Sequence, residues 1–224
     1  MLITTNYTVT DKILQDAIDD LPKIDSRLAL NEPTGSFFND PWVIKPEFVG
    51  TVWETILDSL AEDKGEARLI KLAQGVCYPS HADIDDRWHL SIDGDHSYLI
   101  DLETNTMHQS SEAGRWYLMD AGVRHSAANF GSKDRIQLVV RKLLVNATLQ
   151  NPVNVVIKMT DVAERRFIFD DLISPWANRA YKRSIISYFK ATQEEVHLTI
   201  EESCLPELQA IVNSNSNLIL NEYQ

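Results

Sequence analysis

The sequence has few cysteines, glycines and prolines for its length. Its 224 residues include only two cysteines, eight glycines and eight prolines. Cys77 and Cys204 lie too far apart in sequence to indicate a disulfide framework or a cysteine-rich zinc site, so reduced thiols are the simpler interpretation. The low glycine and proline content, with 44% hydrophobic residues, indicates an ordinary globular protein and not a disordered or fibrous chain.

Basic residues and long apolar segments are also scarce. Lysine and arginine total 21 against 33 aspartates and glutamates, which gives a formal net charge of -12. This charge argues against nucleic acid or an anionic membrane as the main partner. No apolar run approaches the roughly 20 residues that a membrane-spanning helix needs. Residues 1–10 lack the pattern of a signal peptide, so we expect a cytoplasmic protein.

The first 65 residues combine helical patterns with an irregular segment. Apolar residues at helical spacing predict one helix between residues 11 and 22 and a second over residues 46–62. Residues 25–46 are interrupted by proline and glycine but contain several aromatic side chains, which favours an ordered loop or short strands. Part of this segment, residues 31–42, is a candidate lid over a binding site.

Short strands separated by turns are predicted in the middle of the chain. Residues 67–76 have the composition of a strand, and residues 87–92 alternate apolar and polar side chains. Asp93-Gly94-Asp95 predicts a tight hairpin turn before a strand at residues 98–102. Residues 135–144 alternate in the same way and are expected to close the sheet. This succession is typical of an antiparallel barrel or a jelly roll.

The last third of the sequence changes character again. One strand is predicted at residues 153–157. Helical patterns follow in three stretches, residues 161–171, 175–191 and 193–212. We therefore expect a core with N-terminal helices over residues 1–148 and a helical C-terminal extension over residues 149–224.

Two histidines and one aspartate have the spacing of a metal site. His81 and Asp83 are two residues apart, so their side chains share one side of an extended chain, and His125 comes from a distant strand. Such a set matches the 2-His-1-carboxylate facial triad of non-haem Fe(II) sites. Arg135 begins the next strand, and its planar guanidinium suits bidentate binding of a carboxylate.

These residues belong to a longer pattern that resembles a known enzyme family. The pattern consists of His81-x-Asp83, Arg87-x-His89-Leu90, Trp116, His125, Asn129 and Arg135. It is similar to that of the Fe(II)/2-oxoglutarate-dependent dioxygenases of the aspartyl/asparaginyl β-hydroxylase and L-proline cis-4-hydroxylase group. The resemblance covers roughly residues 76–144.

The resemblance implies a fold and a cofactor set. The fold is a double-stranded β-helix, a cupin-like jelly roll, which makes the chain mainly β with flanking helices. The resemblance also implies that His81, Asp83 and His125 are the iron ligands and catalytic centre. Arg135 would then pair with the distal carboxylate of the cosubstrate 2-oxoglutarate.

The resemblance assigns further residues with less detail. Arg87 and His89 would lie near the cosubstrate, although they also fit a solvated polar face. Trp116 and Asn129 are candidate substrate contacts, but a large aromatic side chain such as that of Trp116 is usually buried in a core.

The implied activity is hydroxylation of a C–H bond in a proline-like amino acid or a peptidyl residue, with succinate and carbon dioxide as coproducts. The aspartyl hydroxylases lack the carboxylate ligand, so the presence of Asp83 favours the members that act on free amino acids. Two alternatives remain open. One is a cupin-like metalloprotein that uses Zn(II) or Mn(II) without 2-oxoglutarate, and the other is a non-catalytic binding module.

Overall fold

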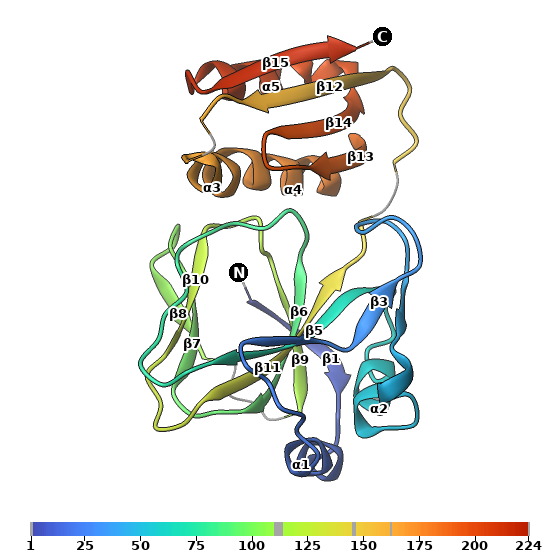
Figure 1. Ribbon diagram of the computed structural model, residues 1–224, viewed down its shortest axis with the longest axis vertical. Coiled ribbons are helices and arrows are strands. Elements are labelled where there is room, and N and C mark those ends of the chain that lie inside the picture. The colour runs from blue at the N-terminus through green and yellow to red at the C-terminus, as the bar shows by residue number, and fades with distance from the viewer. Residues whose placement is uncertain (1, 110–113, 145–146, 162, 224) are drawn as a thin grey trace. The chain divides into compact units, whose positions relative to one another are not determined.

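The computed structural model is mainly β, with antiparallel sheets and a few short helices (Figure 1). It describes residues 2–109, 114–144, 147–161 and 163–223. The chain forms two compact units. Unit 1 contains Met1–His81 and Asp85–Leu143, and unit 2 contains Ala82–Ile84 and Leu144–Gln224.

Unit 1 contains three antiparallel sheets. The six-stranded sheet has the order β1-β9-β6-β11-β5-β2, the three-stranded sheet the order β10-β7-β8, and β3 pairs with β4. The strands are β1 (Leu2–Thr8), β2 (Arg27–Ala29), β3 (Asn31–Pro33), β4 (Trp42–Ile44), β5 (Lys64–Leu72), β6 (Arg87–Asp93), β7 (Ser97–Asp101), β8 (Thr106–His108), β9 (Arg115–Met119), β10 (His125–Asn129) and β11 (Arg135–Lys142).

The first predicted helix is confirmed, and the second is shorter than predicted. Helix α1 (Asp11–Asp19) starts after Thr10, whose hydroxyl accepts a hydrogen bond from the first turn. In place of one helix over residues 46–62, the chain forms the 3-10 turn η1 (Pro46–Phe48) and then α2 (Val52–Asp58). Gly50 lies between them with φ of +73°, a left-handed conformation that interrupts a helix.

One face of the six-stranded sheet packs against α1 and α2. Its buried apolar side chains come from alternate positions of the strands, as the period of two requires. The strand residues of this core are Ala67, Leu69, Trp88, Leu90, Ile92, Trp116, Ile136, Leu138 and Val140. In Figure 1, α2 and the three-stranded sheet lie on opposite sides of the six-stranded sheet.

The opposite face of the six-stranded sheet packs against the three-stranded sheet. Leu72 of β5 and Met119 of β9 form a second buried cluster with Leu99 of β7 and Ala127 of β10. Two antiparallel sheets packed face to face are consistent with the predicted jelly roll.

The turn at residues 93–95 does not form the predicted hairpin. β6 pairs with β9 and β11, whereas β7 pairs with β10 and β8, so this turn carries the chain from one sheet to the other. Gly94 adopts φ of +136°, and a Cβ atom there would lie 3.2 Å from the Cα atom of Arg135. A turn sequence indicates a change of direction but does not determine which strands pair.

β11 also has a different place from the one predicted. It lies between β5 and β6 inside the six-stranded sheet and does not close an edge. Residues of β11 are therefore buried on both faces, from Arg135 to Arg141.

Unit 2 is a mixed unit and not the predicted helical extension. Its four-stranded antiparallel sheet has the order β13-β14-β12-β15, where α4 contacts β13 and α5 contacts β15. The elements are β12 (Pro152–Met159), α3 (Arg165–Ile168), the π-helical turn η2 (Phe169–Ile173), α4 (Ser174–Lys182), β13 (Ile186–Ala191), β14 (Glu195–Glu201), the 3-10 turn η3 (Glu202–Cys204), α5 (Leu205–Asn213) and β15 (Leu218–Tyr223).

The helices predicted over residues 175–191 and 193–212 are therefore partly wrong. In β14, Val196, Leu198 and Ile200 are buried while the residues between them are half-buried, which is the period of a strand. No helix in the described part of the chain is long and apolar enough to cross a membrane.

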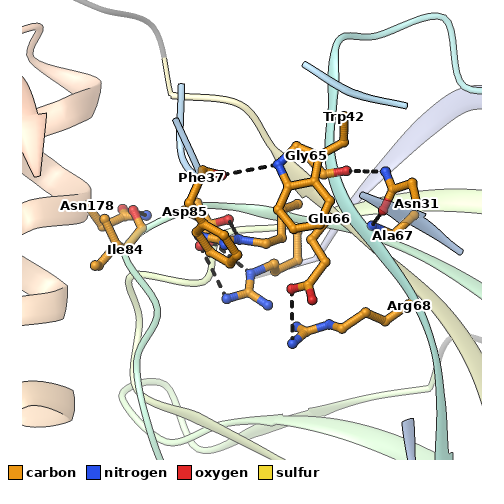
Figure 2. A network of polar contacts seen from close by, with 12 residues as sticks. Asn31, Phe37, Trp42, Gly65, Glu66, Ala67, Arg68, Ile84, Asp85 and Asn178 are labelled. Carbon is orange, nitrogen blue, oxygen red and sulfur yellow. Dashed lines mark hydrogen bonds and ion pairs between the residues drawn. The ribbon is translucent and has the colours of Figure 1, made fainter. Parts of the chain in front are cut away.

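Asn31 links β3 to β5 in unit 1 (Figure 2). Its side chain is 3% exposed. Its Nδ2 donates to the carbonyl oxygen of Gly65 at 2.8 Å, and its Oδ1 accepts from the backbone N–H of Ala67 at 2.7 Å. One buried amide thus satisfies two backbone groups of β5.

We expect Asn31→Ala to lower the free energy of unfolding by about 2–4 kcal/mol, because it leaves two buried backbone groups without a hydrogen bond. Chemical denaturation followed by tryptophan fluorescence measures this loss. Glu32→Ala, at the next and exposed position of β3, is the control and should change stability by less than about 0.5 kcal/mol. An equal effect of both substitutions would contradict the assigned role.

Candidate metal centre

His81, Asp83 and His125 lie together in the folded chain. One ligand atom of each residue, an imidazole nitrogen or a carboxylate oxygen, lies within 4.8 Å of the others. His125 is buried, whereas His81 and Asp83 are half-buried. The structure therefore brings together the three residues that the sequence predicted as ligands.

Antiparallel pairing explains why the two histidines are adjacent. His81 and His125 form an isolated β-bridge, in which the N–H of His81 donates to the carbonyl of His125 at 2.9 Å and the N–H of His125 to the carbonyl of His81 at 2.8 Å. Directly paired residues project from the same face. The two imidazole ring centroids consequently lie 4.4 Å apart.

Hydrogen bonds fix the orientation of both imidazoles. The Nδ1 atom of His81 lies 3.0 Å from the carbonyl oxygen of Pro79, and that of His125 lies 2.8 Å from the carbonyl oxygen of Val123. A carbonyl can only accept, so each Nδ1 carries the proton and each Nε2 keeps its lone pair. Histidines that bind a metal through Nε2 commonly donate the Nδ1 proton to a carbonyl in this way.

The donor set fits a divalent transition metal. Asp83 adds one carboxylate beside two neutral imidazole nitrogens, and the three residues leave positions for other ligands. Imidazole and carboxylate together suit Fe(II), and also Zn(II) or Mn(II). The geometry supports metal binding without choosing among these ions.

Arg135 is buried without a carboxylate partner in the described part of the chain. It is 3% exposed, and its Nη2 donates to Oε1 of Gln137. Burial lowers the pKa of Arg135 to about 10, partly opposed by Tyr78. The buried guanidinium therefore donates to a neutral amide and has further N–H groups that this contact does not use.

His89 shares the same amide. Its Nδ1 lies 3.0 Å from Oε1 of Gln137, so Nδ1 is the donor. Its Nε2 is buried and has no hydrogen-bond partner among the described residues. Burial lowers the pKa of His89 to about 3, and nearby Arg135 and Arg87 lower it further against the effect of Gln137. His89 is therefore a neutral imidazole with an available acceptor.

Arg87 contacts Asp85, two residues before it in the chain. Its Nε donates to the backbone carbonyl of Asp85 at 3.3 Å, and its Nη2 to Oδ1 of Asp85 at 3.2 Å. It pairs with Arg141 across β6 and β11, six residues along β11 from Arg135. At about 3.4 Å per residue, this separation is roughly 20 Å. Arg87 therefore lies away from Arg135.

The candidate substrate contacts Trp116 and Asn129 have structural roles. Trp116 is fully buried in the core that α2 covers, and its Nε1 donates to Oγ of Ser59 at 3.0 Å. Asn129 is also fully buried, and its side chain bonds backbone groups of Leu72, Lys133 and Gly131. Neither side chain is exposed, so the structure gives no support to the two predicted substrate contacts.

Two residues to which the sequence assigned no role connect residues that it did single out. Gln137 joins Arg135 to His89, and Asp85 joins Arg87 to Arg141. Alternation along β11 places Gln137 and Arg141 on the face of Arg135, but their partners His89 and Asp85 come from β6 and from the loop before it. Only the register of the strands identifies those partners.

The sequence matches no protein-family model and no curated protein. Among solved structures, a cupin domain from Bordetella pertussis Tohama I matches with a TM-score of 0.32 and 11% identity, over 53% of this chain and 97% of that one. CapF, crystallised with the inhibitor 3-isopropenyl-tropolone, matches with a TM-score of 0.31 and 14% identity, over 59% of this chain. This match spans 42% of CapF.

Similarities of this size do not bear on function, so the description of the fold rests on the strand pairings. The sheets and the triad define a mainly β protein of antiparallel sheets with a candidate metal centre.

We expect His125→Ala to weaken binding of Co(II) or Fe(II) by more than the 10- to 100-fold that typically follows loss of an outer-shell partner. Anaerobic titration calorimetry measures this affinity. His108→Ala removes a histidine of β8 that is not part of the cluster and should leave the affinity unchanged. Equal metal binding by wild type and His125→Ala would exclude the triad as the site.

His89 should make the folded state sensitive to acid. Its pKa is about 3 in the fold against 6.5 in the unfolded chain, so only the unfolded state takes up this proton as the pH falls below 6.5. From pH 7 to pH 5 this linkage costs about 2 kcal/mol of stability.

His89→Asn removes the titrating group and should lose about 2 kcal/mol less stability than wild type over the same pH interval. Urea denaturation at both pH values measures the difference. His108→Asn is the control and should follow the wild type. A pH dependence of His89→Asn identical to that of wild type would contradict burial of a neutral imidazole.

Proposed function

We propose that this protein is an Fe(II)- and 2-oxoglutarate-dependent dioxygenase that hydroxylates a C–H bond of an amino acid. The observation that carries the proposal is the combination of a His-Asp-His cluster with a buried arginine that has no carboxylate partner among the described residues. A metal site alone fits many reactions. A metal site together with a carboxylate anchor fits a reaction that uses a metal-chelating dicarboxylate.

With Fe(II) bound, the centre would supply oxidative decarboxylation of 2-oxoglutarate by dioxygen to succinate and carbon dioxide, coupled to insertion of one oxygen atom into a C–H bond. His81, Asp83 and His125 would hold the metal through two nitrogens and one oxygen. The Nδ1–H bonds of the two histidines keep both rings in the orientation that binding requires.

Arg135 would bind the distal carboxylate of the cosubstrate. Its guanidinium donates several N–H groups in one plane, of which the described contacts use one for Gln137. An incoming carboxylate would form an ion pair with the guanidinium and so offset the hydration that Arg135 loses on burial. The neutral amide of Gln137 cannot form an ion pair. Gln137 would act as a positioning residue, because it orients both Arg135 and His89.

His89 would contribute a polar atom beside the cosubstrate. Its unpartnered Nε2 accepts a hydrogen bond in the neutral state. A carboxylate beside this atom would favour the protonated imidazole, because the negative charge stabilises the positive charge that burial disfavours.

The test is anaerobic addition of Fe(II) and 2-oxoglutarate to the purified protein. We expect the weak visible absorption band of an Fe(II)–2-oxoglutarate chelate, and succinate formation when dioxygen is admitted with a suitable amino acid. The panel comprises free proline, aspartate, asparagine and arginine together with proline-containing peptides. Metal binding without this band and without succinate would favour the alternative of a cupin-like metalloprotein with another chemistry.

Arg135→Ala should weaken 2-oxoglutarate binding by about 10- to 100-fold, since it removes a charge-assisted pair. Arg135→Lys should recover only part of the affinity, because an ammonium cannot bind bidentately. Arg166→Ala removes an exposed arginine of unit 2 and should change nothing. Unchanged affinity in Arg135→Ala, measured from the absorption band, would exclude the anchor role.

A further inference from the structure

Asn178 is a buried polar residue of α4 that contacts the segment around Asp83. It is 3% exposed, and its Nδ2 donates to the carbonyl oxygen of Ile84 at 2.9 Å (Figure 2). Both residues belong to unit 2, which includes Ala82–Ile84 besides the C-terminal elements. Ile84 directly follows Asp83, the carboxylate of the candidate metal centre. Asn178 therefore contacts the chain one residue away from a predicted ligand.

Helix α4 has both apolar and polar buried residues. Seven of its nine residues are buried, whereas a helix that only covers a sheet buries one apolar stripe. Ser174, Asn178 and Tyr181 lie at i, i+4 and i+7 and form a buried polar stripe. Burial of polar groups costs free energy unless other parts of the chain satisfy them. The carbonyl of Ile84 accepts from Asn178, so Ile84 lies against this stripe.

Asp83 lies in a short segment that has no helix or strand of its own. Residues 82–86 connect the β-bridge residue His81 to β6 and adopt no regular secondary structure. Ala82 and Ile84 are buried, at 2% and 5% exposure, while Asp83 between them is half-buried. The position of Asp83 therefore depends on the contacts of its neighbours and not on a ladder of backbone hydrogen bonds.

Contacts on both sides of Asp83 also anchor this segment. His81, two residues before Asp83, is held by the β-bridge, and Asp85, two residues after it, forms ion pairs with two arginines. Each residue adds two soft backbone dihedral angles, so anchors two residues away allow the carboxylate to shift. Asn178 fixes the adjacent residue, Ile84. Its hydrogen bond therefore restricts Asp83 more closely than the other two anchors.

We propose that Asn178 is a positioning residue of the metal centre, whose hydrogen bond to the carbonyl of Ile84 holds the carboxylate of Asp83 in place for metal binding. A metal ligand must lie within about 0.5 Å of its productive position, and partners outside the ligand set provide this precision. Asn178 acts through the backbone and does not itself bind the metal. The inference concerns metal binding alone, so it goes beyond the proposed oxygenase reaction and does not depend on it.

The test measures the Ni(II) affinity of the full chain by titration calorimetry. Ni(II) binds nitrogen and oxygen ligands more tightly than Fe(II) or Co(II), so its affinity can still be measured after one ligand is removed. Asn178→Leu keeps the approximate side-chain size but removes the donor, and it should weaken Ni(II) binding by about tenfold or more. Asn178→Gln keeps a donor on a longer side chain and should restore part of the affinity. Wild-type affinity in Asn178→Leu overturns the proposal.

Asn178→Asp repeats the test with a side chain of almost the same shape, in case the leucine variant does not fold. Its carboxylate has no N–H group to donate and repels the carbonyl oxygen of Ile84. It should weaken Ni(II) binding at least as much as Asn178→Leu. Wild-type affinity in this variant likewise overturns the proposal.

A second background separates positioning from a general effect on folding. Asp83→Ala removes the carboxylate that Asn178 is proposed to position. In this background Asn178→Leu should cause no further loss of Ni(II) affinity, because both substitutions act on the same ligand. An equal loss in both backgrounds would show that Asn178 only supports the fold, and the positioning role would be wrong.

Val212→Ala is the matched control within unit 2. Val212 is 3% exposed in α5, so its truncation lowers the stability of the unit without removing the hydrogen bond to Ile84. It should leave the Ni(II) affinity unchanged. A loss of affinity as large as that of Asn178→Leu would overturn the assignment, because any destabilisation of unit 2 would then have the same effect.

The absorption spectrum of bound Co(II) is a readout that does not depend on affinity. Its visible bands report the ligands of the metal and their geometry. At saturating Co(II), the spectrum of Asn178→Leu should be shifted from that of wild type toward that of Asp83→Ala. A wild-type spectrum in Asn178→Leu contradicts a change in the position of Asp83 and overturns the proposal.

The outcomes separate this inference from the proposed function. If wild type and Asn178→Leu bind Ni(II) equally while Fe(II) and 2-oxoglutarate give the absorption band, the positioning role is wrong and the oxygenase proposal stands. If Asn178→Leu weakens Ni(II) binding only when Asp83 is present but no such band forms, the positioning role stands and the oxygenase proposal is wrong.

Discussion

The strict alternation of side chains along β5, β6 and β11 is the constraint on which both the core and the site depend. One set of alternate residues, such as Leu69, Leu90 and Leu138, is buried against the helices of unit 1. The other set contains Arg68 and His89. A shift of one residue in register would place arginines in the apolar core, at a desolvation cost of several kcal/mol per charge. The register is therefore strongly specified.

The same alternation leaves cationic groups in an environment that does not fully solvate or neutralise them. Arg135 contacts only the neutral amide of Gln137, and Arg68 has one nitrogen without a partner among the described residues. Each arrangement lowers the stability of the ligand-free fold. An anion that binds the folded state would return this free energy as affinity. The histidines of the candidate metal centre are oriented independently, by backbone carbonyls.

The sequence predicted features that depend on residues close together in the chain better than features that depend on distant strands. Helix α1 depends on a cap and on apolar spacing within nine residues, and it was predicted. The proximity of His81 and Asp83 follows from two residues of extended chain. The predicted hairpin at residues 93–95 was wrong because partner choice depends on distant strands. The helices predicted over residues 175–191 and 193–212 were partly wrong for a similar reason, since the pairing of β13 with β14 overrides weak helical spacing.

The sequence by itself determined the residue types of the site, the spacing of His81 and Asp83, and the alternation that groups the arginines. It could not determine which residues lie opposite one another. The pairing of His81 with His125 and the sharing of Gln137 by Arg135 and His89 exist only in the tertiary structure. The burial of Trp116 and Asn129 was likewise decided there. The physical reason is that hydrogen bonds and burial between distant segments depend on strand register and sheet order, which no local pattern encodes.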